Sequence, residues 1–279
     1  MSGLSQEIHR RDRAAAPCQV GPIEYTVSRV MEHPLETDCL IIAAGKGSRL
    51  VARGEPKPLV ALGGTTLIER VMCTVASAGI RSFCIVTGYL AGQIERFVPA
   101  SPLLSGLNVR FVHNADWERA NGLSVACAAG GLGRRFVLLM SDHLFDGRIL
   151  SRLLAEPIGD DEVILAVDSR IHDHPTADLD DVTKVRVEGG GIRDIGKTLV
   201  DYNAFDTGIF LCTPALFAAL DESFRGGDYS LSGGIRVLAA RGKARSFDIG
   251  DALWIDVDDD PAYDRAEALF SPRPGDAQG

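Results

Sequence analysis

The sequence predicts an α/β domain in which helices flank a mostly parallel, mixed sheet. Short, continuously apolar runs recur along the chain, as expected of strands that are buried on both faces of a sheet. Segments with apolar residues at helical spacing separate these runs, which implies crossover connections between parallel strands. The chain has 279 residues, of which 46% are hydrophobic and 24% charged, and this suits one large domain with its own core.

The first half of the chain predicts strands and helices in alternation. The predicted strands are the apolar runs at residues 39–44, 82–88, 108–114, 135–143 and 162–168. The predicted helices have apolar residues at helical spacing and cover residues 66–79, 90–98, 122–132 and 148–156. The first of them ends in a glycine, Gly79, as helices commonly do.

This regular order ends after Asp168. Residues 182–197 alternate around three consecutive glycines and predict a β-hairpin. The remaining predicted strands lie at residues 204–212, 244–250 and 252–258, and the remaining helices start at Pro214 and cover residues 231–243 and 260–270. In the last helix, Asp260 is the expected N-cap and Pro261 the first helical residue.

The ends of the chain look different from its middle. We predict a domain over residues 37–271, an N-terminal arm that is partly flexible (residues 1–36) and a disordered tail (residues 272–279). The first 36 residues show no secretory signal, and no run in the chain approaches the ~18 apolar residues of a membrane span.

Composition restricts the partners of the protein. The formal net charge is −9, which argues against a general nucleic-acid surface. The six cysteines form no CxxC pair and are interpreted as reduced residues. The sequence therefore predicts a cytoplasmic protein that acts on small molecules and is not embedded in a membrane. Whether it forms a homo-oligomer is left open.

The first functional signal is IIAAGKGSRL (residues 41–50), where two glycines and two cations follow an apolar run. Such a loop suits phosphate, because glycine lets backbone N–H groups approach the oxygens. It lacks the GxxxxGK[ST] spacing of a Walker A loop. It also lacks the third glycine of a dinucleotide fingerprint, where Leu50 stands, and the next strand does not end in an acidic residue. A tight turn between a strand and a helix is the alternative interpretation.

The loop is followed by PKPL (residues 56–59) and LIERV (residues 67–71), and this combination resembles the signature of the sugar-phosphate nucleotidylyltransferases. The resemblance implies an enzyme with a single Rossmann-like nucleotidyltransferase domain of the GT-A-like type. Backbone N–H groups, an arginine and a lysine would then hold a nucleoside triphosphate, and the residues concerned are Ala43, Ala44, Gly45, Gly47, Ser48, Arg49 and Lys57. Arg49 can grip two oxygens at once, whereas Lys57 acts as a point charge.

A second segment, NGLSVACAA (residues 121–129), resembles the part of these enzymes that contacts the nucleobase and the ribose. Asn121, Gly122 and Ser124 stand at its start. A plain helix N-terminus is the alternative interpretation of these residues.

Three aspartates are candidates for binding Mg²⁺. Asp142 follows a buried strand, and ligands of open α/β sheets bind outside the carboxyl ends of the strands. Asp256 and Asp258 point to one face of their strand, and paired carboxylates suit a hard cation. The resemblance implies that Asp142 and Asp258 hold Mg²⁺ with Asp256 close by, while helix capping is the alternative role of the acidic run. His143 is interpreted as a neighbour of the site or an exposed residue, not as a ligand.

The second half of the chain most resembles the inositol-1-phosphate cytidylyltransferases, through residues 180–197, 202–210 and 229–258 in the same order. By this resemblance Lys184 and Lys197 would be catalytic together with Arg49 and Lys57, and the two lysines would hold the acceptor phosphate and the triphosphate between them. Asp206 would lie near the hydroxyl groups of the acceptor, and Asn203 adds a polar group suited to a polyol.

The expected reaction is CTP plus inositol-1-phosphate, giving CDP-inositol and pyrophosphate, with Mg²⁺ as cofactor. The ionised acceptor phosphate would attack the α-phosphorus in line, without a general base or a covalent nucleophile. Phosphocholine, a hexose-1-phosphate and an aminoalkyl phosphonate are alternative acceptors. The aromatic content of 6% disfavours the aromatic cage that phosphocholine would need. A non-catalytic nucleotide-binding regulatory domain is the alternative to an enzyme.

Overall fold

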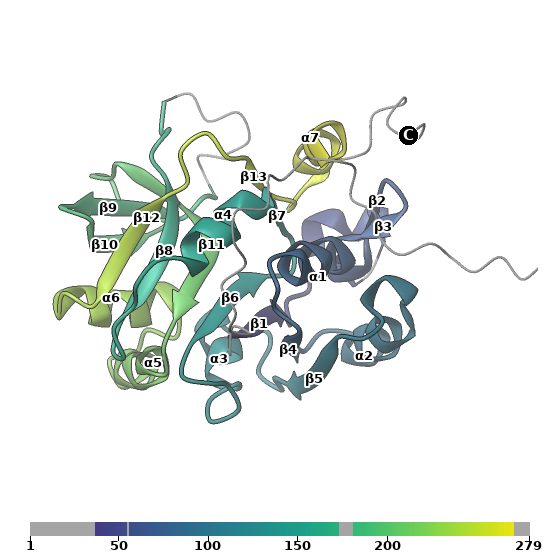
Figure 1. Ribbon diagram of the computed structural model, residues 1–279, viewed down its shortest axis with the longest axis horizontal. Helices are drawn as coiled ribbons and strands as arrows, with labels where there is room; N and C mark the ends of the chain where they lie inside the picture. The colour runs from purple at the N-terminus through teal and green to yellow at the C-terminus, as the bar shows by residue number, and fades with distance from the viewer. Residues whose placement is uncertain (1–36, 55, 173–180, 271–279) are drawn as a thin grey trace, which may run out of the picture.

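The computed structural model describes residues 37–54, 56–172 and 181–270. The predicted arm and tail lie outside these residues. Within them, one twisted sheet runs through the molecule and helices lie on both of its faces (Figure 1). None of the helices in these ranges combines the length and apolar character that crossing a membrane requires.

The strands follow the predicted apolar runs, and β2, β3 and β7 are additions to them. They are β1 (Asp38–Ala43), β2 (Ala61–Leu62), β3 (Thr65–Thr66), β4 (Ser82–Thr87), β5 (Asn108–His113), β6 (Phe136–Met140), β7 (His143–Phe145), β8 (Val163–Asp168), β9 (Lys184–Glu188), β10 (Gly191–Gly196), β11 (Ala204–Cys212), β12 (Ala244–Asp248) and β13 (Trp254–Asp256). Gly63 and Gly64, with φ of +57° and +82°, close the small hairpin of β2 and β3.

The main sheet has the strand order β5-β4-β1-β6-β11-β8-β12-β10-β9 within the described residues. Pairing is parallel from β5 to β6, as the alternation of strands and helices predicts, and again between β8 and β12. β11 runs antiparallel to its neighbours β6 and β8, which makes the sheet mixed. β9 and β10 form the predicted hairpin, and β7 pairs with β13 in a separate two-stranded ribbon.

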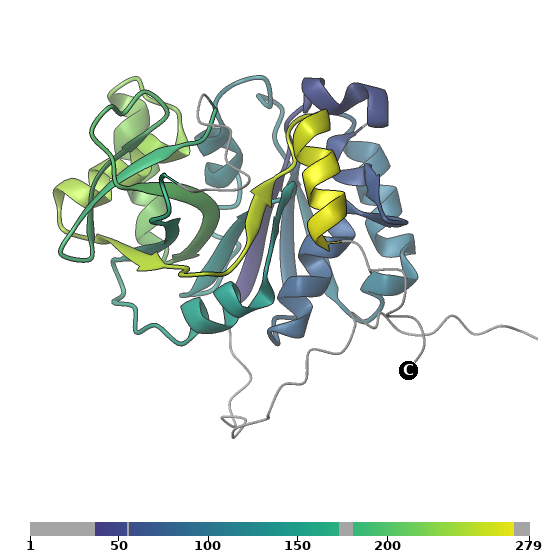
Figure 2. The same cartoon turned by 90° about the horizontal axis from the view of Figure 1, so that it is seen from above.

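The helices cover both faces of the sheet, as the view from above shows (Figure 2). They are α1 (Leu67–Ser77), α2 (Ala91–Ala100), α3 (Asn121–Ala126), α4 (Gly147–Leu154), α5 (Ala215–Arg225), α6 (Leu231–Ala240) and α7 (Asp260–Phe270), with short 3₁₀ helices η1 (Ser48–Arg53), η2 (Lys57–Leu59) and η3 (Pro102–Leu104). Cys39 and Ile41 of β1 join the hydrophobic cluster of α1, α2, α4 and α7, whereas Leu40 and Ile42 join that of α3, α5 and α6. Burial on both faces explains why this strand is apolar throughout.

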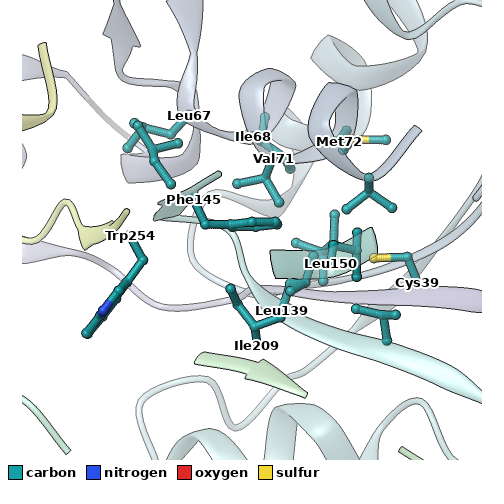
Figure 3. Packing of buried hydrophobic residues seen from close by; sticks show 14 of the residues in the cluster. Cys39, Leu67, Ile68, Val71, Met72, Leu139, Phe145, Leu150, Ile209 and Trp254 are labelled. Carbon is teal, nitrogen blue, oxygen red and sulfur yellow. The ribbon is translucent and has the colours of Figure 1, made fainter. Parts of the chain in front are cut away.

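The ribbon of β7 and β13 is anchored in the core (Figure 3). Phe145 of β7 lies between Ile68 and Val71 of α1 on one side and Leu139 and Ile209 of the main sheet on the other. This packing holds the ribbon in place, together with the polar residues that it carries to the edge of the core.

Two predicted helix boundaries were wrong. The helix expected over residues 122–132 is shorter, because α3 ends at Ala126 and turns follow it. The last helix is capped by Asp259 and not by Asp260, since Oδ1 of Asp259 accepts a hydrogen bond from the N–H of Ala262 at 2.7 Å. That N–H is the third of the helix, the position that an N-cap side chain reaches.

Candidate active site

A cleft of about 380 Å³ opens at the carboxyl ends of β1 and β6, where ligands of α/β sheets bind. Most of the residues that the sequence predicts for the site line this cleft, namely Ala43, Gly45, Gly47, Arg49, Lys57, Asn121, Ser124, Asp142, Lys197, Asp206, Asp256 and Asp258. Five predicted residues lie outside the lining, namely Ala44, Ser48, Gly122, Lys184 and Asn203.

The two glycines of the loop have different roles. Gly45 has open space where a side chain would stand, so ligand atoms can approach its backbone. Gly47 has a φ of +61°, and a Cβ there would lie 2.5 Å from Cδ of Lys57. Leu50, which stands where a dinucleotide loop has glycine, is 1% exposed and packs in the core. The loop is therefore built around the stem of Lys57.

Lys57 lies at the centre of a charged cluster. Its side chain is 6% exposed, and its Nζ contacts the carboxylates of Asp142 (2.5 Å), Asp256 (3.8 Å) and Asp258. Burial alone would lower the pKa of Lys57, but the three carboxylates outweigh burial and raise this pKa above its ordinary value. Arg49 extends the cluster, because its guanidinium pairs with Asp258 at 2.5 Å.

His143 is buried beside the same carboxylates. Its Nδ1 donates a hydrogen bond to the carbonyl of Thr207 at 2.7 Å, and its Nε2 lies 3.4 Å from Oδ2 of Asp256. Burial opposes protonation of this ring, but Asp256 and Asp142 raise the pKa of His143 to about 10. The two carboxylates therefore favour the protonated form of the ring. Gly208 makes room for it, since a Cβ at this position would collide with the imidazole ring.

The carboxylate cluster fits a divalent cation. Ligand atoms of Asp142, His143 and Asp256 lie within 4.8 Å of one another. Oδ1 of Asp256 is buried, and no described residue gives it a hydrogen bond. Mg²⁺ prefers oxygen ligands to an imidazole nitrogen, and Asp258 shares the ammonium of Lys57 with Asp142 and Asp256. The oxygens of Asp142, Asp256 and Asp258 are therefore the donor set that suits Mg²⁺.

The side of the cleft predicted for the acceptor contains fewer of the expected groups. Lys197 lines the cleft and pairs with Asp181, which also pairs with Arg49. Lys184 donates to the carbonyl of Lys197 at 3.3 Å and thus lies next to the cleft. Asn203 bonds both backbone groups of a β9 residue, at 2.8 and 2.9 Å. Its amide is therefore hydrogen-bonded within the sheet, and the acceptor-binding role of Asn203 stays a prediction.

Asp206 lines the cleft from β11 and is buried. Its Oδ1 accepts a hydrogen bond from the N–H of Gly208 at 2.7 Å. Burial raises the pKa of Asp206 to about 6. This carboxylate is consequently charged at neutral pH, and its buried charge lowers the stability of the folded state.

Asp206→Asn should stabilise the protein at neutral pH. Because the pKa of Asp206 is raised from 3.8 to about 6 on folding, its charge destabilises the folded state above pH 3.8 and does so fully above pH 6. Asparagine keeps the acceptor for Gly208 without the charge. We expect a gain of up to about 3 kcal/mol in the free energy of unfolding at pH 8 and none near pH 4, measured by urea titration. An equal gain at both pH values would exclude the buried charge as its cause.

The start of α3 is fixed to the segment that precedes α6. Oδ1 of Asn121 accepts a hydrogen bond from the first backbone N–H of α6 at 3.0 Å. A Cβ on Gly122 would lie 2.5 Å from the carbonyl oxygen of Tyr229. Oγ of Ser124 accepts from Nδ2 of Asn114 at 2.9 Å. These residues hold the cleft together, while Asn121 and Ser124 also line it.

Further residues of the cleft were not predicted from the sequence, among them Trp117, Arg119, Asp181 and Arg265. They come from turns of the chain and from α7, without a recognisable motif. Asp181 lies close in the sequence to the predicted Lys184, which is the one signal that was available. Arg119 stacks on the ring of Tyr229, with its guanidinium carbon 4.2 Å from the ring centre.

Comparison with known proteins finds similar sequences and a similar structure. Residues 39–186 match the MobA-like NTP transferase domain. A bifunctional IPC transferase and DIPP synthase from Rubrobacter xylanophilus is 36% identical over 221 residues, which are 78% of this chain and 48% of that protein. A 2-aminoethylphosphonate cytidylyltransferase from Lancefieldella rimae is 32% identical over 126 residues, which are 40% of this chain and 48% of that protein.

Among solved structures, the inositol-1-phosphate CTP transferase from T. maritima has a TM-score of 0.71 and 27% sequence identity, over 84% of this chain and 94% of that chain. The chain spans about half the length of the bifunctional relatives it matches, 48% of the Rubrobacter protein and 41% of a second one, from Archaeoglobus fulgidus.

Proposed function

The chain belongs to the MobA-like NTP transferase family, and from this premise we propose that it is a Mg²⁺-dependent cytidylyltransferase, which converts CTP and inositol-1-phosphate to CDP-inositol and pyrophosphate. The supporting observation is the buried ammonium of Lys57 among the carboxylates of Asp142, Asp256 and Asp258. Nucleotidyl transfer needs cations for the triphosphate and oxygen ligands for a metal, and this cluster supplies both in one place.

The acceptor side of the reaction requires positioning more than proton transfer. A phosphate monoester is ionised at neutral pH, so it can attack the α-phosphorus without a base from the protein. Lys197 would hold this phosphate, and Asp206 would accept hydrogen bonds from hydroxyl groups of the acceptor. Holding two anionic reactants in line is the main contribution of these residues to the rate.

The donor side uses the charged cluster. Bound to Asp142, Asp256 and Asp258, Mg²⁺ would neutralise charge on the phosphate oxygens. Lys57 and Arg49 pair with these carboxylates, so each can exchange a carboxylate oxygen for a phosphate oxygen. After the exchange each cation is paired with a phosphate oxygen in place of a carboxylate oxygen. Lys57 and Arg49 would then stabilise the charge of the pyrophosphate as it leaves.

The substrates are proposed from the relatives together with the cleft. The T. maritima enzyme, an inositol-1-phosphate CTP transferase, is matched over 94% of its length. The 2-aminoethylphosphonate cytidylyltransferase matches 40% of this chain, which supports CTP as donor and makes its acceptor the main alternative. Trp117 and Trp254 line the cleft, so phosphocholine also belongs in the test.

The free thiols of Cys39, Cys84 and Cys212 support the cytoplasmic location that the sequence predicts.

A matrix of substrates tests this proposal. CTP, UTP, ATP and GTP are each combined with inositol-1-phosphate, phosphocholine, glucose-1-phosphate and 2-aminoethylphosphonate in the presence of Mg²⁺, and pyrophosphate release is measured. We expect the highest kcat/KM for CTP with inositol-1-phosphate. A higher value for another pair would replace the proposed substrates, and no release with any pair would support the non-catalytic alternative.

A further inference from the structure

Arg265 of α7 lines the cleft and forms no ion pair with any of the described residues. Its Nε is buried and has no hydrogen-bond acceptor in the described part of the chain. Within the same residues no carboxylate forms an ion pair with its guanidinium group. A buried donor without a partner is unfavourable, so native structures rarely keep one unless a ligand or water completes it.

The other cations of the cleft differ from Arg265 in this respect. Lys57 and Arg49 are neutralised by the aspartates of the charged cluster, and Lys197 is neutralised by Asp181. Arg119 has no ion pair among the described residues but stacks on an aromatic ring. Arg265 therefore offers a fork of donors that is already available to an anion before any ion pair has to break.

The position of Arg265 is fixed by the contacts of α7. Arg53, in the 3₁₀ helix after the glycine loop, pairs with Asp260 at 2.5 Å and Asp264 at 2.9 Å. The hydroxyl of Tyr263 donates to the carbonyl of Ala61 at 2.7 Å. These bonds tie both the start and the middle of α7 to the chain that follows the glycine loop, so Arg265 lies on the triphosphate side of the cleft.

We propose that Arg265 binds the outer phosphates of the nucleoside triphosphate, the part that leaves as pyrophosphate. The ligand class rests on the proposed function, whereas the subsite itself rests on the free guanidinium group. The groups proposed for the acceptor come from other elements, Asp206 from β11 and Lys197 from the end of β10. A planar guanidinium matches two phosphate oxygens, and a triphosphate is the ligand in this reaction that brings the most of them.

Isothermal titration of Arg265→Gln with CTP, CMP and inorganic triphosphate tests this assignment. CMP lacks the outer phosphates, and inorganic triphosphate lacks the base. We expect the variant to bind CTP and triphosphate about 10- to 100-fold more weakly than the unaltered protein, and CMP equally well. Arg265→Lys should recover part of the loss, because it keeps the charge but not the fork. The melting temperature of Arg265→Gln should not fall, since the removed donor has no partner.

Arg119→Gln is the matched control, because Arg119 also lines the cleft and forms no ion pair within the described part of the chain. This control should not weaken the binding of CTP more than the binding of CMP. The assignment would be overturned if Arg265→Gln weakened the binding of CTP and of CMP equally, or if it left the binding of triphosphate unchanged. It would also be overturned if the unaltered protein bound no triphosphate. If triphosphate binding depends on Arg265 but no substrate pair releases pyrophosphate, the subsite stands and the proposed function fails. If turnover and the KM for CTP are normal in Arg265→Gln, the subsite fails and the function stands.

Discussion

Asp142→Asn should lower kcat about 100-fold or more and leave the fold intact. Asp142 follows β6 at the carboxyl edge of the sheet, and its carboxylate contacts Lys57 at 2.5 Å. In the proposed reaction its carboxylate would hold the metal beside the phosphates. The loss of one preorganised electrostatic group typically lowers kcat by about this factor of 100. Lys57 keeps Asp256 and Asp258 as partners in the variant, so we expect a cooperative unfolding transition near that of the unaltered protein.

Pyrophosphate release at saturating substrates measures this effect, and Mn²⁺ binding followed by electron paramagnetic resonance separates metal affinity from turnover. Asp259→Asn is the matched control, since Asp259 lines the same cleft but caps α7, and asparagine is an equally good N-cap. Near-normal turnover in Asp142→Asn, or an equal loss in the control, would remove Asp142 from the proposed metal site.

The parallel half of the fold could be predicted because its signals are local. β1 is buried on both faces and is therefore apolar throughout, and α1 carries its own capping box of Thr66 and Glu69. The placement of β11 between β6 and β8 could not be predicted, because it depends on pairings between segments far apart in the sequence. The three-residue β7 was missed for the same reason, since its partner β13 comes more than a hundred residues later.

The site follows the same rule. Arg49 and Lys57 belong to a contiguous signature, and the structure brings both into the cleft. Asp181 was not predicted, although it pairs with Arg49, because nothing in the local sequence indicates which cation this half-buried aspartate will meet. Asn203 was assigned to the acceptor from its polarity alone, and the structure shows its amide hydrogen-bonded to the backbone of β9. Arg265 became visible only through the burial of its unpaired Nε.

Lys57→Met should reduce turnover and also destabilise the protein in a way that depends on pH. The substitution keeps the apolar stem that passes beneath Gly47 but removes the ammonium from Asp142, Asp256 and Asp258. Breaking a buried ion pair by removing one partner costs about 3–5 kcal/mol, because the remaining charges are left uncompensated. We expect a loss of this size in the free energy of unfolding at pH 8. The cluster is also the proposed metal site, so added Mg²⁺ should stabilise the variant more than the unaltered protein, whose own ammonium competes for the same oxygens.

The direction of the pH effect follows from the groups involved. In the unaltered protein the pKa of Lys57 is raised, so its stabilisation is complete below the ordinary value of 10.5 and is lost only as pH rises through the higher folded value. In the variant the three carboxylates repel one another, and acid relieves them by protonation. The difference between the two proteins, measured by urea unfolding, should therefore shrink from pH 8 to pH 4. Lys46→Met, on the exposed part of the same loop, should change stability by about 0.5 kcal/mol or less at either pH. If the loss in Lys57→Met is the same at both pH values and Mg²⁺ does not reduce it, the stem packing of Lys57 and not its charge holds this part of the cleft together.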